Sequence, residues 1–319
     1  MKKRCRKVIK LDYRLIVATL AAAVRSGTPI LFAVIGEILT ERAGVLNLGL
    51  EGLMLIGALS GFMGAYLSSN LWFAVIIAML MGGLFSLLFA VLTVTLKANQ
   101  VVSGLALTMM GTGLTAFIGK DYIGKTAERF QNFPLPLLGE IPFFGPILFN
   151  QDWLVYITYL LVPLSWYYIF HTRWGMEMRA VGETPKTADS SGINVFAVRY
   201  VYVIIGGMIT ALGGAYLSLA STSMWIENMS AGRGWIAVAL VIFAGWNPLK
   251  GILGAYLFGG VSILRLRLEA IGTGIPSHIL MMFPYLLTLI VLVLSSGEKM
   301  RKKIGAPTEV GKPYSREEN

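Results

Sequence analysis

The feature that most constrains the fold is a long stretch without charge: residues 52–96 contain no Asp, Glu, Lys or Arg. A helix needs roughly 20 apolar residues to cross the hydrocarbon core of a bilayer, so this stretch has room for two crossings. Over the whole chain 55% of residues are hydrophobic and 14% are charged, whereas about 25% are charged in a typical soluble protein. These observations exclude a water-soluble enzyme and predict an integral membrane protein.

Charged residues elsewhere mark where further crossings begin and end. Residues 68–70 predict the turn between the two crossings of the uncharged stretch. Six more apolar segments lie between charges, at about 101–119, 153–170, 200–220, 234–246, 251–268 and 277–296. Backbone groups find no water inside a membrane, so each segment must be helical, and none shows the alternation of a β-barrel strand. We therefore expect an all-α integral membrane protein, a polytopic helical bundle.

The distribution of charge predicts the orientation. Seven Lys or Arg against one Asp precede the first apolar segment, and six against four Glu follow the last one. By the positive-inside rule we expect a basic cytoplasmic N-terminal segment at 1–14, a transmembrane domain at 15–296 and a charged cytoplasmic tail at 297–319. Because crossings alternate in direction, the two polar loops fall on opposite sides, external at 120–152 and cytoplasmic at 171–199.

The N-terminal region leaves two interpretations open. A single crossing at about 15–36 would put the basic residues outside, against the positive-inside rule. The sequence Arg25-Ser-Gly-Thr-Pro29 instead favours a break into two short helices or a re-entrant one, because proline suits the first turn of a helix. The expected total is therefore nine or ten transmembrane helices.

Two parts of the chain look like copies of each other. Residues 43–47 can be aligned with 231–235, Gly82-Gly83 with Gly259-Gly260, and Met109-Met110 with Met281-Met282. The three pairs keep their order, and the first copy would start inside and the second outside. This is the plan of an inverted internal repeat, in which transporters place their pathway between the copies. Chance similarity among apolar sequences is the alternative.

Four long motifs follow one another along the chain. They are ERAGVLNLGLEGLMLIGA at 41–58, LKANQVVSGLAL at 96–107, GMEMRAVGETPKTADSSGINV at 175–195 and GRGWIAVALVIFAGWNPLKGILGA at 232–255. In this order they resemble the permease subunits of bacterial ABC importers for simple sugars, branched-chain amino acids and nucleosides. The resemblance covers about 30–296 and is closest to the nucleoside-type branch, which has a polar outer loop similar to residues 134–151.

The resemblance implies a permease subunit of an ATP-driven importer for a small uncharged polar solute. Nucleosides are the expected substrate, with a pentose-type simple sugar as the alternative. The resemblance also implies partners: an ATP-binding subunit that hydrolyses ATP, a second homologous permease subunit, and an extracellular substrate-binding protein or lipoprotein. The expected location is the bacterial cytoplasmic membrane. A stand-alone secondary transporter is less favoured, because ion coupling would need membrane-embedded charges.

In the family that the chain resembles, the loop matching residues 171–199 is the coupling element that docks into the ATP-binding subunit. Thr184-Pro185 predicts a short helix that starts at Pro185. By resemblance, the coupling residues are Gly182, Glu183, Pro185, Ala188, Ser191, Gly192 and Ile193. Gly182→Trp or Ala188→Arg would then uncouple ATP hydrolysis from uptake. An ordinary solvated loop is the alternative interpretation.

Six residues are candidates for the substrate pathway: Asn47, Glu51, Asn99, Gln100, Ser103 and Trp235. A charge in a membrane helix is costly, so Glu51 is expected to face a cavity or to pair with Arg42 or a neighbouring helix. Asn99 and Gln100 are expected either to bind a polar solute or to cap the helix that follows. Trp235 is either a stacking surface for a purine or an interfacial anchor. The candidates include no Arg or Lys, which disfavours a phosphorylated substrate.

Other functional classes find little support. The single cysteine, Cys5, excludes an intramolecular disulfide, and His171 and His278 lack ligand spacing, so we expect no metal site. No G-x-x-x-x-G-K-[ST] motif occurs, so the chain itself is not expected to bind ATP. No Ser-His-Asp set or carboxylate pair lies in a polar segment, so we expect no catalytic residues and no cofactor. Basic residues gather at the ends and loops, so no nucleic-acid partner is expected.

Overall fold

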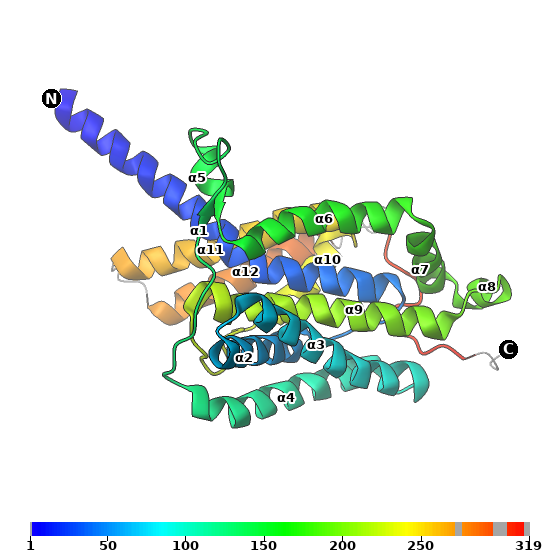
Figure 1. Ribbon diagram of the computed structural model, residues 1–319. Helices are drawn as coiled ribbons and strands as arrows, with labels where there is room; N and C mark the ends of the chain where they lie inside the picture. Colours follow the sequence, from blue (N-terminus) through cyan, green and yellow to red (C-terminus); the bar gives the residue numbers. More distant parts are fainter. Residues whose placement is uncertain (1, 272–275, 296–304, 316–319) are drawn as a thin grey trace.

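The computed structural model describes residues 2–271, 276–295 and 305–315, and helices dominate these ranges (Figure 1). The long helices are α1 (Lys2–Arg42), α2 (Leu50–Ser68), α3 (Leu71–Ala90), α4 (Gln100–Gly119), α6 (Trp153–His171), α9 (Val195–Tyr216), α11 (Pro248–Ile271) and α12 (Ser277–Ser295). The shorter ones are α5 (Phe144–Leu148), α7 (Arg173–Glu183), α8 (Pro185–Ser190) and α10 (Arg233–Ala244).

Short irregular elements complete the chain. A π-helical turn, η1 (Val91–Thr95), extends α3, and a second one, η3 (Leu217–Thr222), extends α9. A 3-10 turn, η2 (Lys120–Tyr122), follows α4. In the predicted external loop, β1 (Phe133–Pro134) pairs antiparallel with β2 (Asn150–Gln151).

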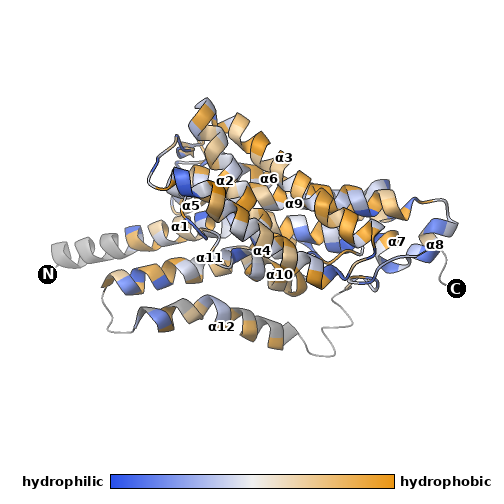
Figure 2. Ribbon diagram, turned by 90° about the horizontal axis from the view of Figure 1, so that it is seen from below, coloured by the Kyte–Doolittle hydropathy of each residue, from blue (hydrophilic) through white to orange (hydrophobic). Residues whose placement is uncertain are grey.

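The apolar helices match the predicted crossings. In the described part of the chain, seven helices are long and apolar enough to cross a membrane, and α10 is a shorter apolar helix. Each predicted apolar segment falls on a helix, including 234–246 on α10 and 277–296 on α12, whose described part ends at Ser295. Figure 2 shows apolar residues along the bundle and polar residues at its two ends, with α7 and α8 at one of them. The expected all-α polytopic architecture is confirmed.

Polar side chains at helix starts explain the helix boundaries. The Asn70 side chain accepts hydrogen bonds from the N–H groups of Trp72 and Phe73 at 3.0 and 3.1 Å, which places the turn where residues 68–70 predict it. Asn194 caps α9 in the same way. Pro185 occupies the first turn of α8, so the predicted start of this helix is confirmed.

α1 runs through the Arg25–Pro29 sequence without a break. The Thr28 hydroxyl donates to the Val24 carbonyl oxygen at 2.9 Å, and α9 and α11 pack closely against this part of α1. A membrane helix tolerates the missing N–H of proline when neighbouring helices and a nearby hydroxyl stabilise the local backbone. The predicted break into two short or re-entrant helices therefore does not occur.

Because α1 is uninterrupted, its two ends lie at opposite ends of the bundle. Tyr13 lies beside Phe143 of the 120–152 loop, with ring centroids 6.3 Å apart. Arg42, at the other end of α1, contacts the 305–315 segment through a hydrogen bond to Gly305. The cytoplasmic location of 1–14 stays a prediction, and this arrangement does not favour it, because one crossing separates that segment from the C-terminal side.

α1 and α9 pack beside each other at the centre of the bundle, and each also packs on a helix from the other half of the chain (Figure 1). α9 packs on α3 at Gly82, where a Cβ would lie 2.7 Å from the Gly207 carbonyl oxygen. α1 packs on α11 at Gly259, where a Cβ would lie 2.5 Å from the Gly27 nitrogen. Gly82 and Gly259 are the glycines that the sequence alignment matched. The two helix pairs meet at equivalent positions, as an inverted repeat requires.

Candidate functional sites: an outer cavity and the α7–α8 element

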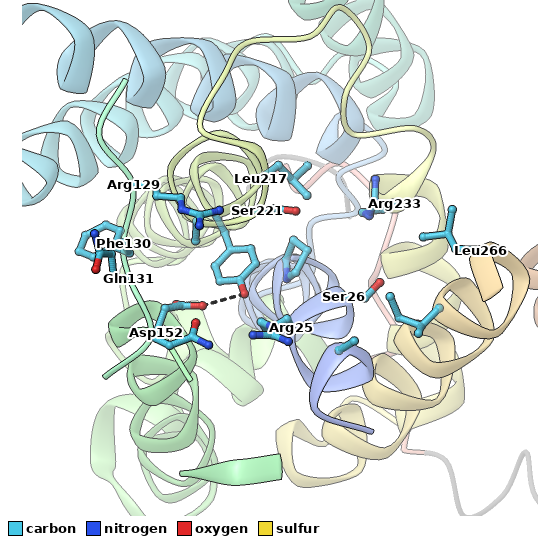
Figure 3. A pocket seen from close by; sticks show the side chains of 16 residues that line it. Arg25, Ser26, Arg129, Phe130, Gln131, Asp152, Leu217, Ser221, Arg233 and Leu266 are labelled. Atoms are coloured by element: carbon cyan, nitrogen blue, oxygen red, sulfur yellow. Dashed lines mark hydrogen bonds between the residues drawn. The ribbon is translucent and has the colours of Figure 1, made fainter. Parts of the chain in front are cut away.

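A cavity of about 720 Å³ lies between α1, η3, α11 and the 129–132 segment (Figure 3). Its polar lining residues are Arg25, Ser26, Arg129, Gln131, Asn132, Asp152, Tyr216, Ser221 and Arg233. Small-molecule sites have volumes of roughly 300–1,000 Å³, so the cavity has room for a sugar or a nucleoside. It lies at the end of the bundle that carries the predicted external loop.

The cavity is electropositive. Arg25, Arg129 and Arg233 line it together with one carboxylate, that of Asp152. Within residues 2–271, 276–295 and 305–315, no ion pair joins these arginines to a carboxylate. Arg233 instead donates from Nη1 to two backbone carbonyl oxygens of the preceding turn, at 3.1 and 2.9 Å. Because guanidinium groups donate to neutral carbonyl and hydroxyl oxygens as well as to anions, the cavity suits either kind of polar solute.

Asp152 is held in the cavity wall by the fold itself. Its Oδ1 accepts hydrogen bonds from the N–H groups of Leu154 and Val155 at 3.0 and 3.1 Å, which caps α6. Its Oδ2 accepts from the Tyr216 hydroxyl at 3.0 Å. Burial raises the pKa of Asp152, and these hydrogen bonds to the ionised form oppose that shift. The Asp152 carboxylate is therefore engaged. A further carboxylate, that of Glu51, interacts with Arg233 from outside the cavity wall and is itself hydrogen-bonded to the start of α10.

α10 is too short to cross a membrane as a single helix. Its 12 residues span about 18 Å, which is less than the roughly 30 Å of the hydrocarbon core. Its far end is held near the end of α1, because Nε of Arg42 donates to the Trp246 carbonyl oxygen at 3.3 Å. The first N–H groups of α10 have no acceptor within the helix, and that of the buried Gly234 needs a partner from elsewhere in the protein.

Glu51, from the first turn of α2, supplies these partners. Its carboxylate accepts hydrogen bonds from the N–H groups of Gly232 and Gly234 at 2.8 and 2.7 Å, and from the Ser230 hydroxyl at 2.5 Å. The side chain is buried. A carboxylate at a helix N-terminus also interacts favourably with the helix dipole. The sequence predicts that Glu51 either faces a cavity or pairs with Arg42 or a neighbouring helix. The geometry favours pairing, and the partner is the start of α10 rather than Arg42.

The other buried pathway candidates hold the turn between α1 and α2. The Asn47 N–H donates to Oε1 of Glu37 at 2.8 Å, and Oε1 of Gln100 accepts from the Leu46 N–H at 2.7 Å. Ser103 is buried one turn further along α4. None of the six predicted pathway residues lines the outer cavity. A role for them in the pathway stays a prediction.

Asn99 lies where its capping interpretation places it. Asn99 caps α4, because its side chain accepts from the Val102 N–H at 3.1 Å. Trp235 is 38% exposed on the surface of α10, and its role as a stacking surface or as an interfacial anchor stays a prediction. Neither side chain lines the outer cavity.

The α7–α8 element lies at the end of the bundle opposite to the external loop (Figure 1). Pro185 and Ala188 face inward, and Ala188 packs in an apolar cluster with Val181 and Val195. Glu183 and Ile193 are half-buried. The exposed face consists of Lys186, Thr187, Ser190, Ser191 and Gly192. The element therefore presents a small polar face to the solvent while its apolar face anchors it to α9.

Gly182 packs directly against the end of α1. A Cβ there would overlap the Arg42 carbonyl oxygen and approach the Gly44 nitrogen to 3.3 Å. Gly182→Trp and Ala188→Arg would therefore disturb internal packing. Of the predicted coupling residues, only Ser191 and Gly192 lie fully on the exposed face, so a clean test of docking needs other positions.

The cavity arginines were missed as functional residues because they are far apart in the sequence. One signal was present: Arg25 is the only charged residue between Arg14 and Glu37. A charge inside an apolar helix usually faces a cavity or a partner. Arg129 and Arg233 carry no such local signal, since both lie at the ends of polar segments.

Comparison with known proteins identifies the family. Residues 19–292 match the family model described as "Branched-chain amino acid transport system / permease component". This chain belongs to that permease family. The resemblance expected from the four sequence motifs is confirmed, and the permease is a multi-pass protein of the cytoplasmic membrane.

Three relatives of this permease are each 37% identical to it over most of both chains. One is a Haloferax volcanii protein provisionally named a glucose ABC transporter permease, with 93% of this chain and 97% of the relative covered. The second is a nucleoside ABC transporter permease of Lactococcus lactis, with coverages of 86% and 91%. The third is a guanosine ABC transporter permease of Bacillus subtilis, with coverages of 90% and 92%. The relatives therefore share the transporter class but differ in substrate.

Proposed function

We propose that this permease is the transmembrane subunit of an ATP-driven importer for nucleosides. Its partners would be an ATP-binding subunit, a second homologous permease and an extracellular substrate-binding protein. ATP hydrolysis would occur in the ATP-binding subunit. The observation that carries the coupling role is the position of α8, which presents an exposed polar face at one end of the bundle while α7 and α9 connect it to the membrane helices.

Coupling would follow from rigid contacts. α7 packs against α9 and the end of α1, and Gly182 allows the backbones of α7 and α1 to touch. A displacement of α8 by the ATP-binding subunit would therefore move α1 and α9. Because α1 packs on α9 and α11, and α9 packs on α3, movement of α1 and α9 would alter the packing of both halves of the chain.

The coupling role is tested by Thr187→Trp, on the exposed face of α8. The bulky side chain should block docking and lower uptake roughly tenfold, which corresponds to about 1.4 kcal/mol. Arg173→Trp is the matched control, since Arg173 is 85% exposed and lies at the start of α7. Uptake and ATPase activity are measured on equal amounts of reconstituted complex. Uptake by Thr187→Trp at the control level would refute the proposed docking face.

Nucleosides are proposed because two of the three relatives described above are named for nucleoside or guanosine transport. The cavity arginines are compatible with them, because guanidinium groups donate to base carbonyl and ribose hydroxyl oxygens. A simple sugar is the second candidate, favoured by the relative named for glucose. An arginine-lined cavity also weakens the case against phosphorylated solutes, which rested on the lack of Arg or Lys among the pathway candidates.

The substrate is tested by a binding screen on the partner substrate-binding protein. Nucleosides, pentoses, glucose and nucleoside monophosphates are titrated separately, and uptake of the tightest ligand is then measured in the reconstituted importer. We expect tight binding of nucleosides alone. Tight binding of a sugar without nucleoside binding, or of monophosphates in preference to nucleosides, would overturn the assignment.

A further inference from the structure

The segment 305–315 crosses the end of the bundle that carries α8, and it contacts four separate elements there. Its first contact is with α1, where Nη1 of Arg42 donates to the Gly305 carbonyl oxygen at 3.2 Å. Its last is with the connection between η1 and α4, where Nζ of Lys97 donates to Oγ of Ser315 at 2.9 Å. We call this segment the strap.

Between these points the strap is bound to the C-terminal end of α7. The Thr308 hydroxyl donates to the carbonyl oxygen of Glu183 and lies 3.3 Å from Oε2 of the same residue. The Glu309 N–H donates to the Gly182 carbonyl oxygen at 3.1 Å. These bonds reach the last two residues of α7, which only Thr184 separates from α8. They also satisfy carbonyl groups that a helix end leaves without partners.

The strap also joins α4 to α9. The Lys312 carbonyl oxygen accepts from Nε2 of Gln100 at 3.4 Å and from Nη1 of Arg199 at 3.2 Å. Gln100 and Arg199 are both 1% exposed, so the strap provides hydrogen bonds to two otherwise enclosed donors. Such bonds are costly to lose, because a buried donor left without a partner pays its full desolvation penalty.

One aromatic side chain of the strap enters the apolar cluster beneath α8. Tyr314 is 7% exposed and packs with Val181, Ala188 and Val195. Its ring lies 5.6 Å from the ring of Phe196 on α9. Ala188 is the inward-facing residue of α8, so Tyr314 forms part of the surface on which α8 rests. A cavity of about 400 Å³ separates the outer part of α8 from the strap.

We propose that the strap is a positioning element of the coupling apparatus, with Thr308 and Tyr314 as its main positioning residues. It holds α7 and α8 against α1, α4 and α9, so that a displacement of α8 reaches the membrane helices instead of being absorbed locally. The inference rests on the proposed coupling role of α8. It requires that the strap affect how much transport each ATP hydrolysed produces.

The test uses the full reconstituted importer with Thr308→Val and Tyr314→Ala, singly and combined. We expect uptake per ATP hydrolysed to fall roughly fivefold in the double variant, while basal ATPase activity persists. The conservative variants Tyr314→Phe and Thr308→Ser keep the aromatic ring and the hydroxyl, respectively. Each should retain the wild-type ratio of uptake to ATP hydrolysed. Lys312→Ala is the matched control within the strap. Only the Lys312 backbone carbonyl makes the contacts with α4 and α9, and its exposed side chain pairs with the half-buried Glu309 of the strap itself.

Two further arms make each outcome informative. Hydrogen exchange of residues 183–195 should accelerate in Tyr314→Ala, since α8 loses part of its support. If Tyr314→Ala fails to assemble, Thr308→Val carries the test, because Thr308 is exposed and only its hydroxyl contacts are lost.

An unchanged ratio of uptake to ATP hydrolysis in assembled Thr308→Val and Tyr314→Ala overturns the proposal. Thr187→Trp is run in parallel: if it uncouples while the strap variants do not, only the strap proposal fails, and if neither uncouples, the coupling role of α8 fails.

Discussion

Glu51 shows how the cost of a buried charge can be met by backbone groups. As an isolated carboxylate at the start of an uncharged stretch, it could be interpreted as a pathway residue or as a structural partner. The structure gives it three hydrogen-bond donors at the start of α10 and a buried position. Because the first N–H groups of a helix have no acceptor within it, the carboxylate and the start of α10 satisfy each other.

Glu51→Ala should therefore destabilise the protein. Two N–H groups and one hydroxyl lose their acceptor, at a cost of about 2 kcal/mol or more. Glu51→Gln should lie between the wild type and Glu51→Ala, since its amide oxygen still accepts but its NH₂ group cannot. The measurement is thermal aggregation of the detergent-solubilised permease. Unchanged melting together with abolished uptake would show instead that Glu51 acts in the pathway.

At the scale of elements, close helix packing depends on glycines whose neighbours are backbone atoms. Gly259 on α11 meets the backbone of α1 at Ala23 and Gly27. At the adjacent Gly260, a methyl group would lie 3.8 Å from the Cβ of Ala23, which is an ordinary van der Waals contact. Membrane helices associate largely through such close packing, because lipid offers no hydrophobic driving force between them.

This contrast predicts different effects for neighbouring substitutions. Gly259→Ala should force α11 away from α1 and cost about 1–3 kcal/mol of stability. Gly260→Ala should leave stability unchanged or raise it slightly, since alanine favours helix. Gly82→Ala, at the equivalent contact of α3 with α9, should behave like Gly259→Ala. Melting temperatures of the purified variants test this difference in stability. Equal effects at Gly259 and Gly260 would contradict the described packing.

At the scale of the whole molecule, the bundle has two functional ends. The outer cavity and the 120–152 loop lie at one end, and α8 with the strap lies at the other (Figure 1). α1 spans the distance between them as one helix. The basic 1–14 segment is therefore predicted by charge to lie on one side and by the course of α1 to lie on the other.

Cysteine labelling distinguishes these two locations. Arg129→Cys in a Cys5→Ser background should react with a membrane-impermeant maleimide in intact cells, and Ser190→Cys only after permeabilisation. The native Cys5, the one cysteine of the chain, reports on the N-terminal segment and should react in intact cells if α1 crosses once. Labelling of Arg129→Cys and Ser190→Cys from the same side would contradict the described architecture. Protection of Cys5 would show that the segment returns to the cytoplasmic side.

The sequence by itself determined where the helices lie and which family the chain resembles. Hydrocarbon tolerates so little charge that the positions of charged residues mark the crossings locally, and the caps at Asn70, Asp152 and Pro185 depend only on the next few residues. The course of α1 through Pro29 was different, because its continuity depends on support from α9 and α11.

Only the tertiary structure decided what the polar side chains do. One cavity brings together residues from distant parts of the chain: Arg25, Arg129, Asp152 and Arg233. In the same way, Thr308 of the strap donates a hydrogen bond to Glu183 of α7. Glu51 could be recognised as needing a partner, but the partner lies 181 residues away, at the start of α10. Such contacts are set by how helices pack, and packing depends on shape complementarity between surfaces that no local pattern records.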